Sequence, residues 1–155
     1  MEKRVADSMI EQVHGIMPQH LNGAGRLFGG ILMQWIDEVA GLTAIRHSQS
    51  PVVTASVDSL RFLRGVSQNE MVVLIGKLTY VGNTSMEVRV DTYVEKLDGT
   101  RYPVNRAYLT LVAVDEAGHP RKVPGLILES VGEQAEWEAG KKRSELRKQR
   151  NIEGF

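Results

Sequence analysis

The segment that decides the fold is Asn22-Gly-Ala-Gly-Arg-Leu-Phe-Gly-Gly30, which leads directly into the apolar run from Ile31 to His47. Apolar residues in this run surround almost the whole circumference of a helix instead of forming one stripe, at positions 31, 32, 33, 35, 36, 39, 40, 42, 44 and 45. We therefore predict a helix that is covered on nearly all sides. Asp37 and Glu38 stand in its middle, where a buried carboxylate is costly unless it is paired, hydrogen-bonded or used in chemistry.

Length and composition indicate one globular domain. The chain has 155 residues, 42% of them hydrophobic and 25% charged, which is ordinary for a protein with a sizeable core. The 19 basic residues balance the 19 acidic ones, so no net charge favours nucleic acid or membrane as a partner. Basic residues gather near the C-terminus without interleaved aromatics. We expect a domain over residues 1–130 and a basic helical tail over residues 131–155.

The absence of cysteine excludes disulfides, thiolate metal sites and cysteine nucleophiles. The N-terminal charges are not followed by an apolar segment, and no window reaches the ~18 apolar residues of a membrane span. We therefore expect a cytoplasmic protein.

Alternating patterns typical of β-strands dominate the remainder of the chain. The predicted strands cover residues 8–17, Val52 to Leu63, Met71 to Val81, Thr84 to Leu97 and Tyr102 to Asp115. Gly82-Asn83 and Asp98-Gly99 are hairpin signals that join the last three. Strict alternation over residues 84–97 predicts one packed and one solvent-facing side, hence an antiparallel sheet.

Four strands in a row joined by tight turns, after one buried helix, favour an α+β fold in which a curved antiparallel sheet wraps around the central helix. One such sheet does not cover a helix that is apolar all round, so we expect a second subunit to complete the cover. Ser130 to Arg150 should form a charged, solvated helix that Trp137 and Leu146 dock on the core.

Motifs for several chemistries are missing. Gly23 and Gly25 are followed by Phe28 where a dinucleotide fingerprint needs a third glycine, and neither a Gly-x-Ser-x-Gly elbow nor a P-loop occurs. The four histidines have no ligand spacing, so no metal site is expected. The groups that remain for catalysis are carboxylates, side-chain amides and backbone N–H donors. They suit thioester hydrolysis, which needs a base with water, or a carboxylate nucleophile, and donors for the oxyanion.

Asp37 is the candidate base or nucleophile, and the amide of Gly30 at the helix N-terminus is the candidate oxyanion donor. Asp37 lies seven positions after Gly30, ~10 Å along the helix, too far for both to reach one carbonyl easily. We infer a site shared by two subunits, with the glycine loop of one facing the helix of the other. The alternatives are an interface or salt-bridge role for Asp37 and Glu38, and a turn-forming role for Asn22.

Several ordered motifs between about Pro18 and Pro124 together resemble the hot-dog-fold acyl-CoA thioester hydrolases, particularly the cytosolic acyl-CoA hydrolase branch. They are the segments from Asn22 to Gly41, Arg46-His47, Val53 to Asp58 and Thr84 to Val88. The resemblance implies a hot-dog fold, a dimer with joined sheets as the minimal unit, and commonly a trimer of dimers.

The resemblance also implies roles for single residues. Asp37 would be catalytic, Asn22 would contribute from across the dimer, and the amides of Gly29 and Gly30 would address the thioester carbonyl. For the CoA moiety, the residues implied are Arg64, Asn83, Thr84 and Ser85. Many relatives have proline where Gly65 stands here, which is a departure beside Arg64.

We therefore expect an acyl-CoA thioesterase that releases free CoA and a carboxylic acid and needs no cofactor, because CoA is part of the substrate and product. Met33, Trp35, Phe62 and Tyr80 are expected to set the depth of the acyl tunnel. The alternative is a non-catalytic hot-dog module that binds or senses acyl-CoA. A dehydratase or isomerase would want a histidine in the central helix, and none precedes Asp37 there.

Overall fold

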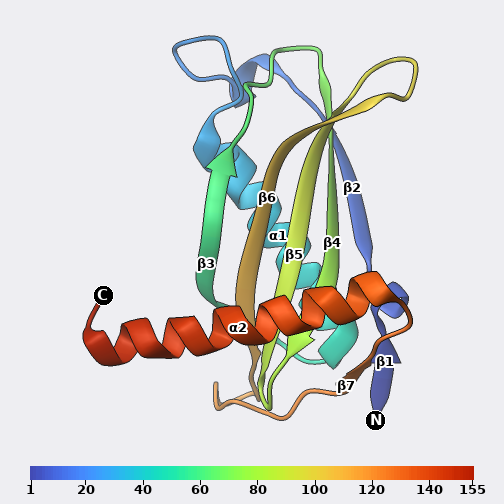
Figure 1. Cartoon of the computed structure of the whole chain (residues 1–155). Helices are drawn as coiled ribbons and strands as arrows, with labels where there is room; N and C mark the ends of the chain where they lie inside the picture. Colours follow the sequence, from blue (N-terminus) through green and yellow to red (C-terminus); the bar gives the residue numbers. More distant parts are fainter.

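The computed structural model describes all residues from 1 to 155, and its main feature is a five-stranded antiparallel sheet between two helices (Figure 1). The elements in chain order are β1 (Glu2–Arg4), η1 (Val5–Asp7), β2 (Ile10–Gly15), η2 (Pro18–His20), α1 (Gly29–Ser48), β3 (Val52–Phe62), β4 (Met71–Val81), β5 (Ser85–Glu95), β6 (Arg101–Ala113), β7 (Gly125–Ile127) and α2 (Val131–Glu153). The predicted central helix and the five predicted strands are confirmed. The short parallel pair β1 and β7 was not predicted, because three-residue strands carry no readable alternation.

The sheet has the order β2-β4-β5-β6-β3. Both predicted hairpins are present, with Gly82 N donating to Ser85 O at 2.9 Å and Lys96 N donating to Thr100 O at 2.9 Å. Strands β3 to β6 follow one another along the chain and share one sheet, as predicted, but no tight turn joins β3 to β4, and β3 pairs with β6 at the edge of the sheet. Hairpin signals report only neighbouring strands, so they did not place β3.

Helix α1 lies against one face of the sheet. Its buried side includes Leu32, Ile36 and Val39, and the backbone of β4 approaches it closely at Gly76. A Cβ at Gly76 would stand 2.6 Å from Thr43 Oγ1 and 2.7 Å from Val39 Cγ1. Glycine is therefore required where helix and sheet touch.

The opposite side of α1 is open. Met33, Leu42 and Ile45 are 45%, 42% and 44% exposed, so a single chain does not provide the complete cover that the apolar pattern predicts. Strand β3 ends the sheet beside this side and exposes Val53 and Val57.

Helix α2 crosses the other face of the sheet (Figure 1), which corrects the prediction that this face is wet. Glu87 is 3% exposed, and Arg143 of α2 pairs with it through Nε at 2.9 Å and Nη2 at 2.8 Å. Trp137 packs on Tyr80 with ring centroids 4.5 Å apart, as predicted for Trp137. Leu146 is 53% exposed, so its predicted docking is wrong.

The contact with Trp137 also places Tyr80 on the sheet face away from α1. The expectation that Tyr80 lines an acyl tunnel beside the central helix is therefore wrong. No helix of the chain combines the length and the apolar character that a membrane crossing demands.

Candidate functional site

The N-terminus of α1 offers two free hydrogen-bond donors. Phe28 precedes the helix and supplies no side-chain cap, and the amides of Gly29 and Gly30 donate to no acceptor within the chain. Unpaired amides at this end of a helix, where the macrodipole is positive, stabilise a negative oxygen. This arrangement agrees with the site expected from the glycine pair.

Asp37 lies two turns further along α1 and faces a cleft of about 320 Å³ that Gly30 also lines. Thr54 of β3 donates its hydroxyl hydrogen to Asp37 Oδ1 at 2.7 Å, which orients the carboxylate and leaves Oδ2 free. The carboxylate is exposed in the single chain, so the burial expected from the sequence does not occur there. Gly30 and Asp37 thus line one cleft within one chain, but the ~10 Å of helix that separates them keeps both from reaching one carbonyl easily.

Thr54 is a functional candidate that the sequence did not single out. It stands within a strand pattern, and nothing local shows that this strand passes beside the middle of α1. Only the position of β3 at the edge of the sheet brings Thr54 to Asp37.

The walls of the Asp37 cleft are mainly apolar. They are formed by Met33, Ile36, Val57, Leu60 and Leu109. Such walls with a few polar groups at one end are typical of a site for an apolar ligand with a reactive head. Met33, one of the residues expected to contact the acyl chain, thus lines the same cleft as Asp37.

Asn22 lines a neighbouring cleft of about 380 Å³, together with Gly29, Phe62 and Arg64. Its Oδ1 accepts from Ala24 N at 2.9 Å and from Arg26 N at 3.2 Å, which is the turn-forming role considered for it. Its Nδ2 makes no hydrogen bond within the chain. The structure therefore brings Asn22 together with Gly29 and Arg64 but does not place it in the cleft of Asp37.

A neighbouring side chain explains the presence of glycine at position 65. The side chain of Arg26 lies over it, and a Cβ at Gly65 would stand 3.0 Å from Arg26 Cδ. Arg64 points its guanidinium toward the ring of Tyr102, 5.4 Å from the centroid, and forms no ion pair. Its charge is thus available to a ligand.

Asn83, Thr84 and Ser85 form the β4–β5 hairpin at the other end of the sheet, near the end of α1 (Figure 1). The carbonyl of Thr84 accepts from Ala113 N at 3.0 Å, and that of Ser85 accepts from Gly82 N. Asn83 lines a separate cavity there. Arg64 and this hairpin therefore do not meet within one chain.

The remaining polar candidates have structural contacts. Glu38 accepts from Gln34 Nε2 at 3.0 Å, in line with the interpretation of Glu38 as structural. His14 stacks on Trp35 at 4.0 Å between centroids, and burial lowers the pKa of His14. No three histidine, aspartate or glutamate side chains gather as metal ligands would.

Comparison with known sequences gives consistent matches. The profile of the thioesterase superfamily matches residues 24–99. An uncharacterized acyl-CoA thioester hydrolase of Bacillus subtilis is 38% identical over 125 residues, which make up 80% of this chain and 73% of that protein. The cytosolic acyl coenzyme A thioester hydrolase of Mus musculus is 34% identical over 143 residues, which cover 90% of this chain but 37% of the mouse protein.

Solved structures agree over almost the whole chain. The acyl-CoA hydrolase of Staphylococcus aureus, in complex with butyryl-CoA, CoA and CoA disulfide, has a TM-score of 0.93 at 34% identity, covering 99% of this chain and 94% of that one. An apo-hexameric acyl-CoA thioesterase has a TM-score of 0.92 at 38% identity, covering 97% of each chain. Variants of the S. aureus enzyme with alanine in place of an aspartate, a threonine or an asparagine match with TM-scores of 0.92, 0.93 and 0.93.

Proposed function

Because this chain belongs to the hot-dog-fold acyl-CoA thioester hydrolases, we propose that it hydrolyses fatty acyl-CoA to free CoA and a carboxylic acid with Asp37 as general base or nucleophile. The observation that carries this proposal is the Thr54-oriented carboxylate of Asp37 at the wall of an apolar cleft. Its apolar walls suit the acyl chain.

The chemistry follows from these groups. With Asp37 as base, Oδ2 takes a proton from water while the water oxygen attacks the thioester carbon. The amides of Gly29 and Gly30 of the second subunit hold the oxyanion, a contribution worth about 3 to 4 kcal/mol per donor in such sites. Collapse of the intermediate breaks the C–S bond, and CoA leaves as the thiolate. With Asp37 as nucleophile, a mixed anhydride forms first and water then hydrolyses it.

Asn22 acts from the second subunit in this proposal. Within one chain it lies in a different cleft from Asp37, and its Nδ2 is free to donate. The substituted asparagine, aspartate and threonine of the S. aureus enzyme follow one another at the spacing of Asn22, Asp37 and Thr54. This spacing supports the choice of these three residues.

The assembly we propose is a dimer in which the outer side of α1 and the free edge of β3 are covered by a second copy. The exposed apolar residues of both elements need such a cover, and an unpaired edge strand readily pairs with another. Relatives with hexameric structures support a trimer of dimers. We also propose that the enzyme is cytoplasmic, as the name of the mouse relative says of that protein, and that it needs no cofactor.

Substitution of Asp37 tests the proposal directly. Asp37→Asn should lower the release of free thiol from acyl-CoA by ~10²- to 10⁴-fold, the usual contribution of a positioned proton acceptor, while the oligomer stays folded. Glu38→Gln is the matched control, because Glu38 neighbours Asp37 and should not affect turnover. Undiminished turnover in Asp37→Asn would refute the assignment. Chain-length preference follows from the same assay with acetyl-, butyryl- and palmitoyl-CoA.

Two further experiments test whether the site is shared between subunits and whether Asp37 is the base or the nucleophile. Mixed oligomers of Asp37→Asn and Asn22→Ala should regain part of the activity if the site is shared, and no recovery in verified mixed oligomers would contradict sharing. A single turnover in H₂¹⁸O that places label in Asp37 identifies it as the nucleophile, because a general base exchanges no oxygen with water.

A non-catalytic acyl-CoA sensor is the rival function. It would bind acyl-CoA without releasing thiol, so the same assay with wild-type protein separates the two. Stoichiometric binding with no turnover would favour the sensor.

A further inference from the structure

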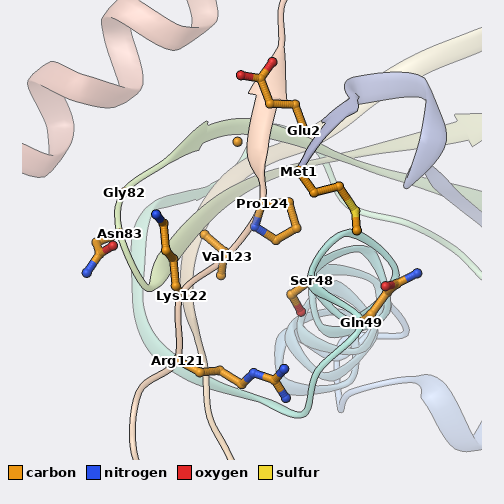
Figure 2. A pocket seen from close by; sticks show the side chains of 11 residues that line it. Met1, Glu2, Ser48, Gln49, Gly82, Asn83, Arg121, Lys122, Val123 and Pro124 are labelled. Carbon is orange, nitrogen blue, oxygen red and sulfur yellow. The ribbon is translucent and has the colours of Figure 1, made fainter.

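Aromatic rings lie against both glycines at the start of α1. A Cβ on Gly30 would stand 2.5 Å from Phe28 Cε1, and a Cβ on Gly29 would stand 3.6 Å from Phe62 Cζ. Phe28 precedes the helix, and Phe62 is the last residue of β3. The cavity at the opposite end of α1, drawn in Figure 2, has no aromatic residue in its walls. The two rings thus belong to the end of α1 that carries the free amides.

The ring of Phe28 is what requires glycine at position 30. Gly30 has no positive φ, so its backbone suits any L-residue. Its role as a donor does not need glycine either, because every residue except proline carries an amide hydrogen. A side chain at this position would, however, take the space that the ring fills. The same argument does not hold for Gly29, where a Cβ would make only an ordinary contact with Phe62.

This ring is not part of the hydrophobic core. Phe28 is 52% exposed, whereas its neighbour Leu27 is 8% exposed and belongs to the core. The backbone of Phe28 is nevertheless fixed on both sides. Its N donates to His20 O at 2.8 Å, and its O accepts from Ile31 N at 3.0 Å. A fixed backbone and an adjacent glycine therefore hold an aromatic ring at a place where it contributes little to the core.

We propose that the Phe28 ring covers the thioester carbonyl when its oxygen is bound by the Gly29 and Gly30 amides, and keeps water away from these donors. This inference rests on the function proposed above. An oxygen bound to the Gly30 amide brings the thioester carbon close to a ring that touches the same residue.

Excluding water at this point favours the transition state. Hydrogen bonds to an oxyanion are stronger where the local dielectric is low and no water competes for the donors. The negative charge on the oxygen develops only as the carbonyl is attacked. Loss of the ring should therefore lower kcat and leave KM nearly unchanged.

Steady-state hydrolysis of butyryl-CoA tests this role. Phe28→Ala should lower kcat by about 10-fold, a part of the ~10²- to 10³-fold that one oxyanion donor contributes. Phe28→Tyr keeps the ring and should restore most of kcat. Phe155→Ala is the matched control, because it removes a phenyl ring that is 83% exposed at the C-terminus. Unchanged kcat in Phe28→Ala, or a loss confined to KM, would overturn the proposal.

The dependence of the ring on Gly30 gives a second test. Gly30→Ala keeps the amide hydrogen but displaces the ring, which is half-exposed and has room to turn into solvent. It should lower kcat about as much as Phe28→Ala does. In the double variant the ring is already absent, so the two losses should not add. Fully additive losses would show that Gly30→Ala acts on something other than the ring, and the proposal would fail.

Fluorine NMR tests the contact without turnover. The chain has three phenylalanines, so labelling with 4-fluorophenylalanine gives three signals, which Phe28→Tyr and Phe62→Tyr assign. The probe is the ketone analogue of butyryl-CoA, in which a methylene group replaces the sulfur. It keeps the carbonyl and releases no thiol. Bound analogue should shift the signal of Phe28 and leave that of Phe155 unchanged.

These results separate the inference from the function on which it rests. A Phe28 signal that stays unshifted at saturation with the analogue would overturn the inference even if the wild type hydrolyses butyryl-CoA. A shifted signal supports the inference even if the protein releases no thiol. Absence of both turnover and analogue binding would refute the proposed function and the inference with it.

Discussion

Replacing Arg143 by methionine removes the cation that pairs with Glu87 under α2. Glu87 is 3% exposed, and both its oxygens accept from the guanidinium of Arg143, while Thr79 Oγ1 donates a third hydrogen bond at 2.7 Å. The guanidinium also lies over the ring of Tyr108, 3.6 Å from its centroid.

The expected cost follows from this burial. Breaking a buried pair by removing one partner costs about 3 to 5 kcal/mol, because an uncompensated charge is left behind. The Arg143 side chain is 24% exposed, so water partly replaces it and we expect about 3 kcal/mol. The double variant Glu87→Leu/Arg143→Met should be near the wild type, since an apolar pair of similar size leaves no charge under the helix.

Urea unfolding at one fixed protein concentration measures these differences, because assembly contributes to stability. Hydrogen exchange over residues 131–153 shows whether the loss takes the form of local opening of α2. Lys142→Met is the control, as Lys142 is exposed and makes no ion pair. A loss below about 1 kcal/mol in Arg143→Met, or a double variant as unstable as the single one, would refute the reasoning.

Three further substitutions test other parts of the structure. Gly76→Ala should destabilise the protein by about 1 to 3 kcal/mol in urea unfolding, because its Cβ would collide with Thr43 and Val39; an unchanged midpoint would contradict the close approach of α1 and β4. Burial lowers the pKa of His47, so folded His47 stays neutral while unfolded histidine protonates near 6.5; stability is therefore intact above pH ~6.5 and falls below it. His47→Gln keeps a donor for Pro124 O and should flatten that fall without abolishing it, because burial also lowers the pKa of His14; equal slopes from pH 7 to 5 would argue against this. Ser59 has φ 57, so Ser59→Gly should raise the unfolding free energy by about 0.5 kcal/mol, and a decrease would show that the serine side chain is needed at the β3 bulge.

Some of the site could be predicted and some could not. The free amides of Gly29 and Gly30 were predictable, because a glycine pair before an apolar run marks a helix start whose amides lack partners. The hydrogen-bond partner of Asp37 was not predictable, because it depends on where the following strand β3 lies against α1, and local sequence patterns do not give that position. The burial of Glu87 was also missed, since an alternating strand shows which side is polar but not that a helix will cover that side.

The sequence by itself determined the helix, the strands, the hairpins and the resemblance to the acyl-CoA thioester hydrolases. All of these depend on residues that are near one another along the chain, through periodicity, turn chemistry and ordered motifs. Only the tertiary structure decided that β3 pairs with β6, that Thr54 orients Asp37, and that Asn22 and Asp37 open into different clefts. The physical reason is that these contacts join segments distant in the chain, and strand order sets them after each segment has formed.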